Sequence, residues 1–361
     1  MSPTPVERLA NVVEGVRAGR ERAIARAMRV IDERGPQHRE LLQALAPYAG
    51  RARVIGVTGT PGAGKSTLVN ELVACARKSG QRVGVVAVDP TSPYTGGAIL
   101  GDRIRMQRHF LDEGVFIRSL ATRGHLGGLS RSAADVITVL DAAGFDLILV
   151  ETVGVGQDEL EIAQLAQTTV VVVTPGLGDD IQAIKAGILE IADVFAVNKS
   201  DRDGADAAVA DLQQMIALGG VLAHAGSRPA HTGHGHGGVA AIMRPETGGL
   251  SERGWEPLII KTVASRAEGV EDLLRACAAH ADALDASGEA ARRANERRER
   301  RFLTLARELL FEEASLRHAH AFAEALDSAR SGEVDAYTAA AALLARAIAP
   351  ADAGASSEAT G

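Results

Sequence analysis

The chain has 361 residues, of which 46% are hydrophobic and 24% are charged. At roughly 150 residues per domain, this length allows two folding units or one domain with extensions, and the composition excludes a chain that is disordered throughout. A formal net charge of −7 argues against a protein that binds nucleic acid through bulk electrostatics. The aromatic fraction is only 3%, so the core must be built from Ala, Val, Leu and Ile.

The cysteine content and the apolar runs predict the cellular compartment of the protein. Two cysteines, Cys75 and Cys277, cannot form a disulfide framework and indicate a reducing compartment. The amino terminus has no uninterrupted apolar stretch of the kind that a secretory signal needs. No window approaches the roughly 18 apolar residues of a membrane span. We therefore expect a cytoplasmic protein without a membrane or nucleic-acid partner.

Residues 1–50 are predicted to form a helical extension. Apolar side chains recur there at spacings of three and four residues, with Arg and Glu between them. Gly35-Pro36 interrupts the pattern, and Leu41, Leu42 and Leu45 resume it.

From residue 51 the pattern changes to short β-branched runs separated by helical stretches. The runs are apolar at both alternations, as expected for strands buried on both faces. This alternation predicts an α/β domain over residues 51–285, with a mostly parallel sheet wound on both sides. The expected strands are Val54–Thr58, Val83–Asp89, Val115–Ser119, Leu147–Glu151, Val170–Thr174, Val194–Asn198 and Leu258–Thr262.

Three later segments depart from this alternation of strands and helices. Residues 221–256 are rich in Gly and include His231, His234 and His236, and we interpret them as an inserted surface loop. The histidines could bind Ni²⁺ or Zn²⁺, although a solvated loop lacks the second shell of a good metal site. Residues 286–348 return to a helical pattern, and residues 349–361 have the composition of a disordered tail.

A phosphate-binding loop follows the first expected strand. The segment Gly59-Thr60-Pro61-Gly62-Ala63-Gly64-Lys65-Ser66 matches G-x-x-x-x-G-K-[ST], with a buried strand before it and a helix after it. Its backbone N–H groups can surround phosphate oxygens, and the helix amino terminus adds positive potential. Lys65 would neutralise the β- and γ-phosphates, Ser66 would bind Mg²⁺, and Thr67 could bond the α-phosphate.

The end of the sixth strand predicts a preference for guanine. Asn198-Lys199-Ser200-Asp201 has the N-K-x-D spacing, in which the carboxylate of Asp201 accepts from guanine N1–H and the 2-amino group. Adenine offers neither donor and would leave that carboxylate unpaired. Lys199 would lie along the base and Asn198 would tie its loop to the phosphate loop. Val263-Ala264-Ser265, after the last strand, is a candidate third loop near the base.

Acidic residues at strand ends predict the metal site. Asp89 and Glu151 end two strands, and the carboxyl ends of strands face the ligand crevice in open α/β sheets. Together with Ser66 and with Asp102 from a Gly-rich segment, they are the candidate Mg²⁺ ligands.

Hydrolysis also needs an oriented water. Glu151 begins Glu-Thr-Val-Gly154, where Gly154 could sense the γ-phosphate. Val155 stands where Gln is common, and the nearest glutamine is Gln157. We expect slow intrinsic hydrolysis, with Lys65, Asp102, Glu151 and Gln157 as the candidate catalytic residues.

With these residues in place, the chain resembles the methylmalonyl-CoA-mutase-associated GTPases, which are related to signal-recognition-particle-type and nickel-insertion GTPases. The resemblance covers most of residues 51–203 and the LIIKTVASRAEGV segment. It rests on the stretches GVTGTPGAGKST, VAVDPTSPYTGGAILGDRIRM, RGHLGGLSR, ETVGVGQDE, PGLGDDIQAIKAGILEIAD and NKSD.

The resemblance implies a GTP- and Mg²⁺-dependent chaperone that gates cofactor loading of an adenosylcobalamin-dependent acyl-CoA mutase, with the cobalamin bound by that partner. It also implies a homodimer, with residues 286–348 as the dimerisation region. Three switch segments are implied around Asp89–Asp102, Glu151–Asp158 and Gly176–Asp180. The insertion after Ala217 departs from the family pattern.

Two alternative functions stay open at this point. A nickel-insertion metallochaperone would need a thiol–imidazole site near the switches, and neither cysteine lies in a C-x-x-C or C-H pair. An ATP-dependent small-molecule kinase could use the same phosphate loop, but N-K-x-D argues against ATP.

Overall fold

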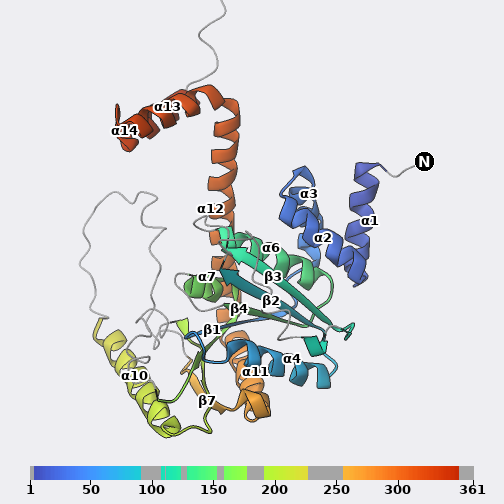
Figure 1. Ribbon diagram of the computed structural model, residues 1–361, viewed down its shortest axis with the longest axis vertical. Coiled ribbons are helices and arrows are strands. Elements are labelled where there is room, and N and C mark those ends of the chain that lie inside the picture. The colour runs from blue at the N-terminus through green and yellow to red at the C-terminus, as the bar shows by residue number, and fades with distance from the viewer. Residues whose placement is uncertain are drawn as a thin grey trace, which may run out of the picture. The chain divides into compact units, whose positions relative to one another are not determined.

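The computed structural model describes residues 4–90, 107–109, 111–122, 128–152, 158–176, 191–226 and 255–348 (Figure 1). By its internal contacts the chain divides into two compact units, Met1–Ala291 and Arg292–Gly361. In the described part of the chain, no helix is both long and apolar enough to cross a membrane.

A seven-stranded sheet forms the centre of the first unit, with the strand order β3-β2-β4-β1-β5-β6-β7. Every pairing between neighbouring strands is parallel, which confirms the α/β fold expected from the alternation of strands and helices. The strands are β1 Arg53–Gly59, β2 Val83–Pro90, β3 Val115–Thr122, β4 Leu147–Thr152, β5 Thr168–Val173, β6 Val194–Asn198 and β7 Leu258–Thr262.

One face of the sheet is covered by α4 (Lys65–Lys78) and α11 (Val270–Ser287), which lie side by side in Figure 1. Alternate residues of the central strands, such as Ile55 and Val57 of β1, point to this face and pack against both helices. Gly269 precedes α11, and the 3₁₀ turn η4 (Ala264–Arg266) leads from β7 into it.

The opposite face carries most of the other helices of this unit. They are α1 Pro5–Arg17, α2 Glu21–Glu33, α3 Pro36–Leu45, α6 Gly128–Ala142, α7 Asp158–Leu165 and α10 Ala205–Gly226, with the short turns η1 Ala46–Tyr48 and η2 Gln107–His109. Val16 and Ile24 from the amino-terminal helices share one hydrophobic core with Val86 and Ile148 of the sheet. A buried ion pair of 2.9 Å between His38 Nε2 and Asp135 Oδ2 also joins α3 to α6. The amino-terminal helices are thus packed into the first unit.

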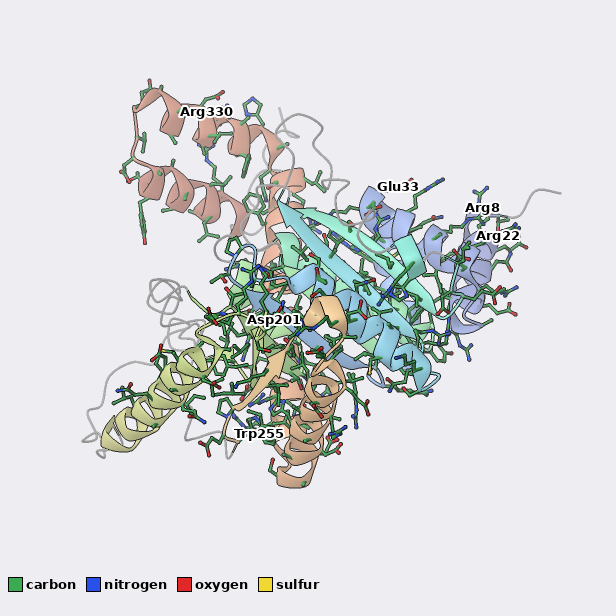
Figure 2. The ribbon with its side chains drawn as sticks, turned by 60° about the horizontal axis from the view of Figure 1, so that its bottom comes forward. Arg8, Arg22, Glu33, Asp201, Trp255 and Arg330 are labelled. Atoms are coloured by element: carbon green, nitrogen blue, oxygen red, sulfur yellow. The ribbon has the colours of Figure 1, made fainter. Side chains whose placement is uncertain are left out.

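Helix α10 runs further than the sequence suggested. It continues to Gly226, so residues 221–226 are helical and do not belong to the expected inserted loop. Val221, Leu222 and Ala223 are adequate helix formers, and the preceding glycine pair costs only about 1 kcal/mol per residue inside a helix. Trp255, at the far end of the expected loop, is half-buried beside α11, with its ring 5.0 Å from that of His280 (Figure 2).

The carboxy-terminal unit consists of long, exposed helices. Its helices are α12 (Glu289–Arg317), most of which belongs to this unit, α13 (Ala319–Ser331) and α14 (Ala336–Ile348). No residue of α12 or α13 is buried. The expected disordered tail, 349–361, and the three histidines of the expected loop lie outside the described residues.

Candidate functional site

The loop between β1 and α4 can be built only with glycine at two positions. Gly59 has φ = +135°, and a Cβ there would lie 2.1 Å from the carbonyl oxygen of Val172. Gly64 has φ = +90°, and its Cβ would lie 2.5 Å from Asn198 Nδ2. These conformations are strained for other residues. They turn the chain directly into α4, whose first residue is Lys65, so the loop stands at a helix amino terminus where anions are favoured.

Lys65 lies inside this loop with only 5% of its surface exposed. Its Nζ donates to the carbonyl oxygens of Gly59 at 2.8 Å and of Thr60 at 3.0 Å. The ammonium group is therefore held by the loop that would receive the phosphates. Thr67, the candidate contact of the α-phosphate, is exposed on the first turn of α4.

Ser66, in the first turn of α4, contacts Glu151 of β4. Ser66 Oγ donates to Glu151 Oε1 at 2.5 Å, and Glu151 is only 2% exposed at the carboxyl end of β4. A hydroxyl and a carboxylate are oxygen donors of the kind that Mg²⁺ prefers, so the two residues fit the metal expected here.

The side chains of two of the four candidate metal ligands lie outside the described part of the chain. Asp102 lies outside the described residues, and although Asp89 belongs to β2, its side chain lies outside the described part. No group of three or more His, Cys, Asp or Glu side chains that could hold a metal ion occurs among the described residues.

Asn198 connects the three loops that surround the site. Its Nδ2 donates to the carbonyl oxygen of Ala63 at 2.7 Å, in the phosphate loop. Its Oδ1 accepts from Thr262 Oγ1 at 3.2 Å and from the backbone N–H of Ala264 at 3.0 Å. The side chain is 2% exposed, so these bonds are shielded from water. The segment 263–265 is thereby held next to the phosphate loop.

Lys199 and Asp201 frame the position expected for a base. Lys199 adopts φ = +57° and its Nζ donates to the carbonyl oxygen of Gly62 at 2.7 Å, so its stem crosses the phosphate loop. Asp201 is exposed beyond it, with Oδ2 3.5 Å from a guanidinium nitrogen of Arg266 (Figure 2). Such an exposed contact is weak, so the carboxylate remains accessible to a ligand.

Several expected site residues lie outside the described part of the chain, namely Gly154, Gln157 and most of the implied switch segments. Two contacts that the sequence did not suggest lie in the described part. Thr262 bonds Asn198, and the hydroxyls of Thr58 and Thr152 meet at 3.1 Å between the ends of β1 and β4. The bond between Thr262 and Asn198 follows from the pairing of β6 with β7, because these two residues lie opposite each other in the parallel register of the two strands.

The chain matches the family model described as "Methylmalonyl Co-A mutase-associated GTPase MeaB" over residues 24–319. A putative GTPase of Pyrococcus abyssi is 42% identical over 331 residues, which span 91% of this chain and 94% of the relative. GTPase ArgK of Escherichia coli is 44% identical over 199 residues, covering 54% of this chain and 60% of that protein.

A mouse relative and one solved structure extend these likenesses. The mouse mitochondrial methylmalonic aciduria type A homolog is 36% identical over 206 residues, covering 52% of this chain and 49% of that protein. A crystal structure titled LAO/AO transport system kinase superposes with a TM-score of 0.63 at 25% identity, covering 95% of this chain and 98% of that one.

Proposed function

Because this chain belongs to the methylmalonyl-CoA mutase-associated GTPases, we propose that it is a cytoplasmic chaperone of an adenosylcobalamin-dependent acyl-CoA mutase. The chain is a GTPase, and GTP with Mg²⁺ is its substrate. The observation that carries the proposal is the family match over residues 24–319. In this proposal GTP binding and hydrolysis gate the loading of cobalamin, which the mutase holds.

The described contacts support a division of roles within the site. Lys65 would neutralise the β- and γ-phosphates from inside the loop. Ser66 and Glu151 would hold Mg²⁺ together with Asp89 and Asp102, and the metal would offset charge on the phosphates.

Recognition of the base would involve the remaining loops. The Asp201 carboxylate would accept from guanine, and Asn198 would keep the loop of residues 263–265 in place. In this proposal Gly154 senses the γ-phosphate and Gln157 is the candidate for orienting water.

Mutase-stimulated turnover tests the proposed function. With Val155 in place of the usual glutamine, slow hydrolysis by the protein alone is expected, because the attacking water is poorly oriented. Adding a methylmalonyl-CoA mutase should raise the rate of GTP turnover by at least about tenfold, which is below the ~10³–10⁵-fold effect of dedicated activators. Phosphate release under single- and multiple-turnover conditions measures this effect.

The same assay separates the proposal from its alternatives. A Lys65→Ala variant should show no stimulation, which excludes contaminating hydrolases. Equal rates with and without isobutyryl-, hydroxyisobutyryl- and methylmalonyl-CoA mutases would contradict the chaperone role. Stimulation by Ni²⁺ and a nickel-dependent partner would favour metal insertion, and phosphorylation of a small molecule would favour a kinase.

We also propose that the protein is a homodimer that associates through its carboxy-terminal unit. Large apolar side chains are exposed along α12, with Phe302 67%, Leu310 72% and Leu316 76% exposed. Together with Leu309 they occupy one side of the helix, about 120° wide at 100° per residue, whereas Phe311 lies on the opposite side and contacts the ring of Phe322. Isolated proteins rarely expose so continuous an apolar stripe, and a second copy of the helix would cover it.

A single charge in this stripe is expected to dissociate the dimer. Leu310→Glu places a carboxylate at the proposed interface, where burying an unpaired charge is costly. Light scattering during size-exclusion chromatography should give about twice the chain mass of 37.6 kDa for the wild type and the chain mass for the variant. Glu308→Gln, about 160° around the same helix, is the matched control and should stay dimeric. A monomeric wild type or a dimeric Leu310→Glu would contradict this surface.

A further inference from the structure

A groove separates the carboxy-terminal half of α4 from α11, on the face of the sheet that these two helices cover. Its volume is about 580 Å³, which falls within the range of ~300–1,000 Å³ typical of small-molecule sites. Arg53 at the start of β1, Leu147 at the start of β4 and Thr168 at the start of β5 line its base. The groove therefore lies at the amino ends of the strands, whereas the phosphate loop lies at their carboxyl ends.

Most of the surface that lines the groove is apolar, and charged side chains also line it. Small side chains on both helices leave the space open, with Ala74 and Cys75 on α4 facing Ala278 on α11, and each of them is half-buried. Burial raises the pKa of the Cys277 thiol to about 12. Burial, with a smaller contribution from Glu271, also raises the pKa of Cys75. Both thiols are therefore protonated at neutral pH and behave as small apolar groups.

The acidic residues that line the groove already have cationic partners. Glu71 pairs with Arg108 at 2.8 Å, and Glu271 pairs with Arg275 at 3.4 Å. Arg53, which also lines the groove, contacts Asp282.

Lys78, the last residue of α4, differs from the charged residues above in its lack of an ion-pair partner within the described ranges. It is exposed, it makes no ion pair with any residue in the described ranges, and its charge acts on the Cys75 thiol within the groove. The groove thus combines an apolar body with one cation that lacks a counter-ion in the described part of the chain.

We propose that this groove binds a small carboxylate with an aliphatic or aromatic body, whose negative group pairs with Lys78 and whose body fills the space between Ala74, Cys75 and Ala278. Apolar surface on these side chains would leave water on binding. The ammonium group would contribute orientation and a preference for anions over neutral or cationic analogues.

The position of the groove links it to the nucleotide site. Helix α4 begins at Lys65 of the phosphate loop, and α11 follows the loop whose Ala264 N–H bonds Asn198. A ligand that binds between the two helices is in contact with both elements that carry these loops. We therefore expect its affinity to depend on bound GDP, and GDP affinity to change by the same factor; this part rests on the proposed function.

Calorimetric titration of the full-length protein with octanoate tests the site. Saturable binding is expected with one equivalent per chain, and octanol and octylamine should bind at least about tenfold more weakly, a difference of about 1.4 kcal/mol. Lys78→Gln should weaken octanoate binding by a similar factor, while Ala278→Phe should abolish it by filling the groove. Arg29→Gln, an exposed charge loss on α2, is the control and should bind as the wild type does.

Each outcome of this experiment decides one part of the proposal. No saturable octanoate binding, or binding that both groove variants leave unchanged, overturns the site. Because Lys78 is exposed, Lys78→Gln remains informative even if Ala278→Phe fails to fold. The titration without nucleotide does not depend on GTP recognition, so it stands or falls separately from the proposed function. Equal octanoate affinities with and without GDP overturn the coupling.

Discussion

Replacing Lys65 with alanine is expected to abolish measurable binding of Mg²⁺·GTP while the protein stays folded. In the structure the Lys65 ammonium group is 2.8 Å from the carbonyl of Gly59 and 3.0 Å from that of Thr60, inside the loop that is expected to receive the phosphates. Hydrogen bonds to charged groups contribute about 1.5–3 kcal/mol each. Loss of two such bonds to phosphate corresponds to a decrease in affinity of roughly 10²–10⁴-fold. Isothermal calorimetry with GTP and Mg²⁺ measures the change.

A matched charge loss separates this effect from a general electrostatic one. Lys261→Ala removes a lysine from the exposed edge strand β7, where it pairs with Asp206, and should leave GTP affinity within about threefold, because exposed pairs contribute less than ~1 kcal/mol. Circular dichroism should show native folds for both variants. Wild-type GTP affinity in a folded Lys65→Ala protein would rule out the phosphate-neutralising role of Lys65.

Exchanging Asp201 for asparagine is expected to change the base preference from guanine to xanthine. Guanine presents two donors, N1–H and the 2-amino group, and the carboxylate of Asp201 can accept both. An asparagine keeps one acceptor but turns an N–H₂ toward the 2-amino group, and we expect GTP to bind about 10²–10⁴-fold more weakly, as for two lost charge-assisted bonds. Xanthine has a carbonyl at that position, so xanthosine triphosphate should bind the variant well. Competition between the two nucleotides measures the exchange.

Asp203→Asn is the corresponding control, because Asp203 is an exposed acid two residues further along the same loop. It should keep the guanine preference of the wild type. If Asp201→Asn retained full selectivity for GTP over xanthosine triphosphate, another residue would have to recognise the 2-amino group.

The strands could be predicted because their pattern is local. In β1 and β4 nearly every residue is buried, so the apolar runs are continuous and each run marks a strand. The phosphate loop is likewise contiguous in sequence, and its two strained glycines are part of the motif that identifies it. A bond from Asn198 to the phosphate loop is likewise expected from the N-K-x-D spacing, and Asn198 ends β6 while the loop follows β1.

Other features depend on contacts between distant residues that leave no local pattern. The buried pair His38–Asp135 joins positions 97 residues apart, and neither residue stands out in its own helix. The groove arises from small side chains on two helices that are far apart in the chain, where each alanine alone is an ordinary helix former. The expected inserted loop over residues 221–256 begins too early, because α10 continues through Gly219-Gly220 to Gly226.

The bonds of Asn198 have a consequence for the kinetics of nucleotide capture. They join the loops after β1, β6 and β7 through bonds within the protein itself, so this part of the cradle is pre-organised. Association then loses little conformational entropy in these loops. We therefore expect the association rate constant for guanine nucleotides to be limited by diffusion and orientation, and differences in affinity among nucleotides to reside mainly in their residence times.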